Sequence, residues 1–143
     1  MNQLNNQQQL IPASAKLHLS EVELQAIDTL ILNIEDWDYF STQIIERGLA
    51  PIFYKKLPLL SNSQLIPTQV QTRLRAAYYK TVSRSMMLYG AYHEVTEQFI
   101  KAGIPVIALK GMYISEHLYQ DIGLRLMSDI DLLVREEDGE RCW

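Results

Sequence analysis

The chain has 143 residues, of which 48% are hydrophobic and 21% charged, and its formal net charge is -4. This composition is typical of a globular protein with one core, and the negative charge argues against general electrostatic attraction to nucleic acid. The single cysteine, Cys142, excludes an internal disulfide. We find no signal peptide and no apolar run long enough to span a membrane, so we expect a cytoplasmic protein.

The first part of the chain predicts a tail followed by helices. Residues 1–19 begin with the Asn/Gln-rich stretch MNQLNNQQQ and are expected to form a disordered tail. Ser20 and Glu23 have the spacing of a capping box, which indicates that a helix begins there. A second helix is predicted from about Asp36 to Arg47, ended by Gly48. Three prolines then break the chain into short turns and a loop.

The longest predicted helix runs from Pro67 to near Gly103. Its apolar and small residues from Val70 to Phe99 recur at steps of three or four, which is one helix face. Four basic residues lie along its first half: Arg73, Arg75, Lys80 and Arg84. They form either a solvated face, which is the simpler interpretation, or a contact with phosphates. Residues 20–103 are therefore expected to be a helical N-terminal region.

The pattern changes after Gly103. The apolar run IPVIALKG predicts a short buried strand, MYISEHLYQDIG a helix closed by Gly123, and SDIDLLV a second strand. The last residues, REEDGERCW, predict a polar turn or the start of a helix. Residues 104–143 would thus form a strand-helix-strand unit, and the whole chain an α+β fold in which helices pack on a small sheet.

Two aspartates, Asp129 and Asp131, lie in the second predicted strand. Because side chains alternate along a strand, both point to one face, roughly 6.6 Å apart along the backbone. At that separation two carboxylates repel by about 2.5 kcal/mol at an effective dielectric constant of 20. Mg²⁺ ions bound between them would relieve this repulsion and suit phosphoryl transfer. The spacing alone favours a plainer interpretation, a turn residue followed by a solvated acid.

The segment VIALKGMYISEHLYQDIGLRLMSDIDLLV resembles the signature of the uncharacterised nucleotidyltransferases of the DNA polymerase β superfamily. In these proteins a strand ending in Lys-Gly, a helix with a Tyr near its end, and an Arg-x-x-Ser-Asp-x-Asp strand occur in this order. DWDYF, RGLAPIFYKKL and the long helix resemble the family's N-terminal part. The resemblance implies transfer of a nucleoside monophosphate from an NTP to an acceptor hydroxyl of a protein, an RNA or a small molecule, with Mg²⁺ or Mn²⁺.

The resemblance also implies roles for single residues. By position, Asp129 and Asp131 match catalytic carboxylates that bind the metal, and Gly111 matches a glycine where backbone N–H groups approach phosphate. Met112 stands where the superfamily usually has serine, and the interval from Gly111 to Asp129 is longer than in many relatives. Lys110 is a candidate to neutralise charge on the triphosphate.

Arg125 and Ser128 complete the candidate site. Arg125 is a second cation for the triphosphate, and Ser128 is a candidate hydrogen-bond donor to phosphate. Each candidate also has a structural interpretation: Lys110 as a solvated turn residue, Arg125 as the partner of an acid such as Asp121, and Ser128 as the start of the strand. His117, among apolar neighbours on its helix, is expected to pack rather than to take part in chemistry.

The superfamily's third carboxylate, on a later strand, has no counterpart in the 12 residues that follow Asp131. The acids in this stretch, Glu136, Glu137, Asp138 and Glu140, are interpreted as solvated. We therefore expect the front part of a longer enzyme, with an incomplete core, little activity of its own and an exposed strand edge that favours self-association. The alternative function is a non-catalytic remnant whose helices bind a protein partner.

Overall fold

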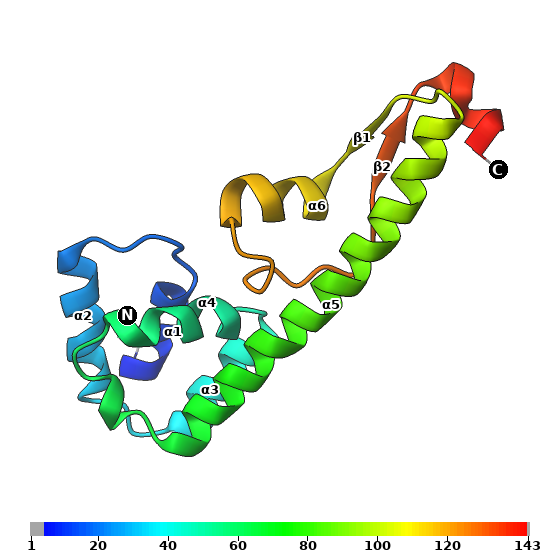
Figure 1. Ribbon diagram of the computed structural model, residues 1–143. Coiled ribbons are helices and arrows are strands. Elements are labelled where there is room, and N and C mark those ends of the chain that lie inside the picture. Colours follow the sequence, from blue (N-terminus) through cyan, green and yellow to red (C-terminus); the bar gives the residue numbers. More distant parts are fainter. Residues whose placement is uncertain (1–4, 143) are drawn as a thin grey trace. The chain divides into compact units, whose positions relative to one another are not determined.

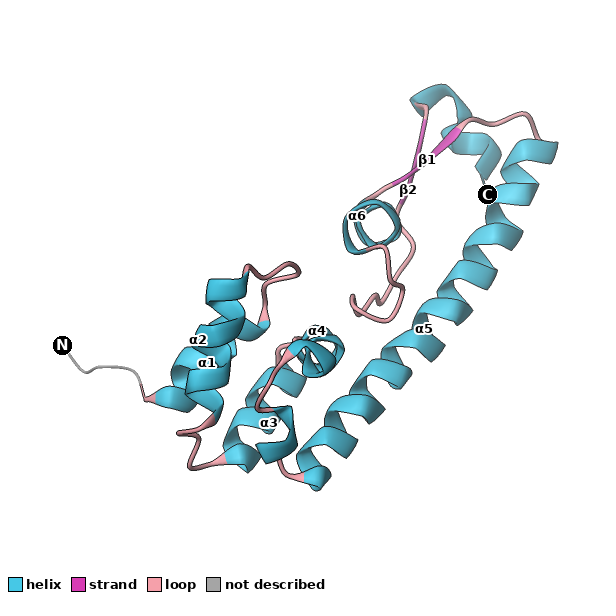
Figure 2. Cartoon of the chain, turned by 60° about the vertical axis from the view of Figure 1, so that its left-hand side comes forward, coloured by secondary structure: helices cyan, strands magenta, loops and turns pink. Residues whose placement is uncertain are grey.

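The computed structural model describes residues 5–142 and divides the chain into two compact units, one ending at Lys80 and one beginning at Thr81 (Figure 1). Within residues 5–142, Figure 2 shows mostly helices, with strands at β1 and β2. The predicted α+β class is therefore confirmed. Among the residues described, no helix combines the length and the apolar character that a membrane span requires.

The first unit is a cluster of helices around one hydrophobic core. Its elements are α1 (Asn6–Ser14), α2 (Glu21–Ile31), α3 (Trp37–Glu46), α4 (Ala50–Lys56), two 3-10 turns (Leu57–Leu59 and Ser63–Leu65) and the first turns of α5 (Thr68–Lys101). Phe40 and Phe53 lie fully buried in the core, where their rings meet edge to face with 5.2 Å between centroids. Such a pair stabilises the core beyond the area it buries.

Helix α1 corrects the prediction of a disordered tail for the residues it contains. The Asn5 side chain accepts a hydrogen bond from the Gln8 backbone, and the Gln8 side chain accepts one from the Asn5 backbone, so the helix has a capping box. Its Leu10 is fully buried in the core. This burial stabilises a segment whose amide-rich composition indicated disorder. Residues 1–4 of the predicted tail lie outside the described part of the chain.

Helices α2 and α3 begin where the sequence predicted. Ser20 and Glu23 form the expected capping box of α2, and the Asp36 side chain accepts a hydrogen bond from the Tyr39 backbone at the start of α3. The pKa of the Glu23 carboxyl is lowered to about 2 by hydrogen bonds from Lys16 first and then from Ser20. Gly48, at φ +69, follows α3 in the left-handed conformation that glycine adopts without strain.

Helix α5 confirms the long predicted helix, because it begins directly after Pro67 and ends two residues before Gly103. The predicted apolar stripe is buried at Val70, Leu74, Thr81 and Ser85. Gly103 has a φ of +68, and Ile104 behind it is buried. Glycine therefore suits the turn between α5 and the sheet, because it adopts this left-handed conformation without strain.

The second unit contains the strand-helix-strand order that the sequence predicted. After the last turns of α5 come β1 (Val106–Ala108), α6 (Lys110–Ile114), a π-helical turn (Ser115–Tyr119), β2 (Leu132–Val134) and a 3-10 helix (Glu136–Cys142). The strands pair antiparallel, with Ile107 opposite Leu133. These two side chains are 60% and 51% exposed, so the sheet is covered on one face only and β1 is not the fully buried strand that was expected.

Two further boundaries differ from the prediction. The helix after β1 ends at Gln120, in the left-handed conformation at φ 54, rather than at Gly123. The second strand begins at Leu132, so the segment 128–131 precedes it as extended loop. Asp138, predicted to be solvated, is buried and accepts a hydrogen bond of 2.7 Å from Arg141. Self-association through a strand edge stays a prediction.

Candidate functional site

The two predicted catalytic acids lie just before β2 rather than inside it. The backbone carbonyl of Asp131 accepts a hydrogen bond of 2.9 Å from the Leu109 N–H, which extends the pairing of the two strands by one step. The Asp131 side chain is 30% exposed, and Asp129 is exposed two residues earlier. Both carboxylates are therefore open to a ligand from solvent, while the backbone of Asp131 is held by the neighbouring strand.

Lys110 is the predicted cation that the structure brings to one of the acids, Asp131. Its ammonium lies 3.1 Å from Asp131 Oδ1, and 71% of its side chain is exposed. The residue has a φ of 44, which is uncommon for a side chain other than glycine and costs of order 1–3 kcal/mol. This backbone bend, between the end of β1 and the start of α6, carries the lysine to the carboxylate.

Gly111 lies at a point of close packing. A Cβ on Gly111 would lie 3.2 Å from Cγ and 3.3 Å from Sδ of Met127, a buried side chain. Since Met127 directly precedes the segment with the acids, the glycine lets the start of α6 approach that segment closely. Its predicted role in binding phosphate stays a prediction.

Ser128 and Arg84 orient the segment before β2. The Ser128 hydroxyl donates a hydrogen bond of 3.0 Å to Asp129 Oδ1, and the Ser128 carbonyl accepts one of 2.8 Å from Arg84 Nη2. Ser128 is thus not part of the strand, contrary to the simpler interpretation. Arg84 was predicted to lie on a helix face, and its sequence neighbours do not indicate this contact, which joins residues 44 positions apart.

Arg125 lies in a different environment. Its guanidinium carbon is 6.0 Å from the centroid of the Tyr119 ring, a distance compatible with a cation–π contact. Its buried Nε atom has no hydrogen-bond partner, and no hydrogen bond or ion pair joins it to Asp129 or Asp131 among the described residues. The predicted contact of Arg125 with a triphosphate stays a prediction.

The donor set fits a hard divalent cation. Two carboxylates supply oxygen ligands, which Mg²⁺ prefers, and one or two carboxylates with substrate phosphates are a usual set for this ion. Within residues 5–142, no three side chains of His, Cys, Asp or Glu gather to form a complete protein site. Asp129 and Asp131 could therefore hold a cation together with a ligand's oxygens.

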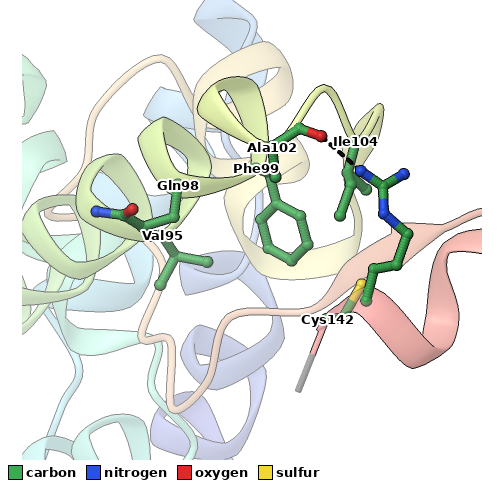
Figure 3. Close-up of a pocket in the computed structure, with 7 residues that line it drawn as sticks. Val95, Gln98, Phe99, Ala102, Ile104 and Cys142 are labelled. Carbon is green, nitrogen blue, oxygen red and sulfur yellow. Dashed lines mark hydrogen bonds between the residues drawn. The ribbon is translucent and has the colours of Figure 1, made fainter.

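A pocket of about 420 Å³ lies elsewhere in the second unit, between the last turns of α5 and the 3-10 helix (Figure 3). Phe99 and Ile104 contribute apolar side chains to its wall, and Cys142 contributes its thiol. The guanidinium of Arg141 donates a hydrogen bond of 2.7 Å to the Ala102 carbonyl, drawn as a dashed line in Figure 3. None of the predicted site residues lines this pocket.

One comparison identifies the family. A family model described as uncharacterised nucleotidyltransferase matches residues 33–142, which is most of the chain and includes every residue of the candidate site. The chain belongs to this nucleotidyltransferase family. No curated protein and no solved structure matches it. Membership gives the general activity, nucleotidyl transfer, and places the segment from Lys110 to Asp131 within the family's matched region.

Proposed function

We propose that the chain binds a metal–NTP complex at Asp129 and Asp131 for transfer of a nucleoside monophosphate to an acceptor hydroxyl, with release of pyrophosphate. The observation that supports this most directly is the accessible carboxylate of Asp131 beside Lys110, with the exposed Asp129 two residues earlier, in a chain of a nucleotidyltransferase family. Carboxylates with an adjacent ammonium can bind a metal and the phosphates it carries.

Asp129 and Asp131 would hold Mg²⁺ or Mn²⁺ through their carboxylate oxygens. When bound, the metal would neutralise charge on the phosphates and polarise the bond to the attacked phosphorus. The hydroxyl of Ser128 donates to Asp129 and so limits the rotation of that carboxylate. Arg84 holds the backbone at Ser128, so both acids belong to a restrained segment. Restraint of this kind reduces the entropy lost on binding.

Lys110 has two states in this proposal. Its ammonium pairs with Asp131 and offsets part of the repulsion between the acids. A cation bound to Asp131 would replace the ammonium, which is then free to contact a phosphate oxygen. The exposed side chain can move in this way because little packing holds it. Lys110 would therefore connect metal binding with phosphate binding.

Binding is the direct test of this proposal. Calorimetric titration of Mn²⁺ and ATP should show binding in the parent chain and its loss in Asp129→Asn and in Asp131→Asn, which keep the shape of the side chain but remove its charge. Glu136→Gln is a suitable control, because it removes an exposed acid from the same unit. Equal binding in the parent and both Asn variants would contradict the proposal and favour the non-catalytic, protein-binding alternative.

A further inference from the structure

Tyr113 and His117 form a stacked pair of rings on the helix that follows Lys110. Their centroids are 4.2 Å apart and their planes differ by 16°. Tyr113 is 55% exposed and His117 is also exposed, so this pair is not part of a core. The expectation that His117 packs rather than takes part in chemistry stays a prediction, but the residue is not buried among apolar neighbours. Its ring packs on tyrosine at the surface instead.

The histidine ring is fixed in its orientation. His117 Nδ1 lies 3.0 Å from the Tyr113 carbonyl oxygen. Since a carbonyl can only accept, Nδ1 carries a proton and donates it to this bond. His117 is part of the π-helical turn Ser115–Tyr119, and turns of this kind occur often at functional sites. The stack and this hydrogen bond restrain the two rings, which form an exposed aromatic surface.

Along the chain, this aromatic surface comes shortly after the candidate phosphate site. Tyr113 and His117 follow Lys110 by three and seven residues along the chain, in α6 and in the π-helical turn after it. Three residues of chain span at most about 11 Å, so Tyr113 lies within the length of a nucleotide from Lys110. Lys110 itself contacts Asp131. A ligand with phosphates at Lys110 and Asp131 could therefore extend along α6 to the rings.

We infer that the Tyr113–His117 pair is the surface on which the base of the NTP stacks. This inference rests on the proposed function and adds the site of the nucleoside. Flat aromatic rings stack on bases without reading their edges, because every base has a π face. Their fixed orientation lowers the entropic cost of stacking. Since the two rings cover each other's inner faces, the base would stack on an outer face of the pair, and the site should accept all four NTPs and favour the purines, whose larger rings overlap more of that face.

The test compares two ligands that differ only in the nucleoside. With Mn²⁺ present, the affinity for ATP and for inorganic tripolyphosphate is measured by calorimetry in the parent chain, Tyr113→Leu, Tyr113→Phe and His117→Leu. Loss of one stack weakens binding about 5- to 150-fold. We expect Tyr113→Leu to weaken ATP binding at least about fivefold and to leave tripolyphosphate binding unchanged. Tyr113→Phe should keep the parent affinity, because it keeps the ring.

Two further measurements make the result decisive. Tyr39→Leu removes a tyrosine that is 40% exposed in the first unit and should change neither affinity. The fluorescence of 2-aminopurine ribonucleoside triphosphate should fall on binding to the parent and fall less with Tyr113→Leu or His117→Leu, because stacking quenches this base. Circular dichroism checks that each variant is folded.

The outcomes separate this inference from the proposed function. If both ligands bind with Mn²⁺ and all variants bind ATP as the parent does, the base does not stack on these rings and only the inference is overturned. If neither ATP nor tripolyphosphate binds with Mn²⁺, the proposed function fails, and the inference that rests on it fails as well. Equal weakening of both ligands by Tyr113→Leu would show a loss of site structure and would overturn stacking.

Discussion

Asp129 and Asp131 repel each other less than their spacing suggests, because both are accessible to water and Lys110 pairs with Asp131. Asp129 is exposed and Asp131 is 30% exposed, so the effective dielectric constant is closer to that of water and the repulsion falls well below about 2.5 kcal/mol. The exposed ion pair of Asp131 with Lys110 contributes about 0–1 kcal/mol. The Asn variants used to test metal binding should therefore fold with a stability within about 1 kcal/mol of the parent. Thermal melts measure this difference.

Lys56 is a buried cation in the first unit. The residue is 3% exposed, and its ammonium donates to the carbonyls of Ser14 and Ala13, at 3.0 and 3.3 Å, at the end of α1. Burial lowers the pKa of Lys56 from 10.5 to about 8; the charge of Glu23 acts in the opposite direction and that of Lys16 in the same direction. Because its pKa is lowered, Lys56 can be used to test how the stability of the protein depends on pH.

The expected pH dependence follows from this lowered pKa. Below pH 8 the lysine is protonated in both the folded and the unfolded chain, so its titration adds no slope. Between pH 8 and 10.5 the folded chain loses this proton while the unfolded chain keeps it, so stability rises with pH. Compared with Lys56→Met, the free energy of unfolding of the parent should increase by at most about 1.4 kcal/mol for each pH unit. Urea unfolding at pH 7, 9 and 10 measures it, and parallel pH profiles of the two proteins would contradict it.

At the scale of elements, α5 orients the candidate site through one side chain. Arg84 donates to the Ser128 carbonyl, and this bond restrains the segment that carries the acids. Arg84→Met keeps much of the aliphatic stem and removes the donor. A hydrogen bond of this kind contributes about 1 kcal/mol, so metal–ATP binding should weaken about fivefold with little change in the stability of the helix.

Arg75→Met is the matched control for Arg84→Met. Arg75 is an exposed arginine of the same helix, and its guanidinium lies 5.6 Å from the Tyr79 ring in the first unit. Calorimetry with Mn²⁺ and ATP, beside thermal melts, compares the two variants. An equal loss of binding in both would indicate a general effect of charge, and unchanged binding in Arg84→Met would show that this bond does not orient the acids.

Elements with local signals were predictable from the sequence. The starts of α2 and α3 depend on hydrogen bonds between residues three positions apart, and Gly48 and Gly103 end helices through their own backbone conformation. Features that depend on contacts between residues far apart in the sequence were not predictable. Helix α1 is stabilised by the burial of its Leu10 in the core. No sequence pattern around Arg84 indicates its hydrogen bond to Ser128.

The candidate site shows the same division between local and distant causes. Lys110, Asp129 and Asp131 are candidates because of their residue types and the resemblance, and their roles stay a prediction. Their placement was not predictable, because β2 is shorter than its apolar pattern suggested. Pairing with β1 ends near Leu109, where the chain turns into α6, so the residues before Asp131 have no strand to pair with.

At the scale of the whole molecule, the two units differ in how much apolar surface they bury. The core cluster of the first unit contains twelve buried residues, from Leu10 to Leu74. Among the described residues of the second unit, the buried hydrophobic side chains are Ile104, Met112 and Met127. Since burial is the main source of stability, the second unit should open more readily than the first.

Hydrogen exchange measured by mass spectrometry tests this difference and its link to ligand binding. Amides in β1, α6 and β2 should exchange faster than amides in α2 and α3. A ligand that binds only the folded second unit stabilises it, and at ten times its dissociation constant Mn²⁺–ATP should slow exchange there about tenfold. The first unit should be unaffected, and Asp129→Asn should abolish the slowing. Equal slowing in both units would contradict a site confined to the second unit, because the ligand would then stabilise the chain as a whole.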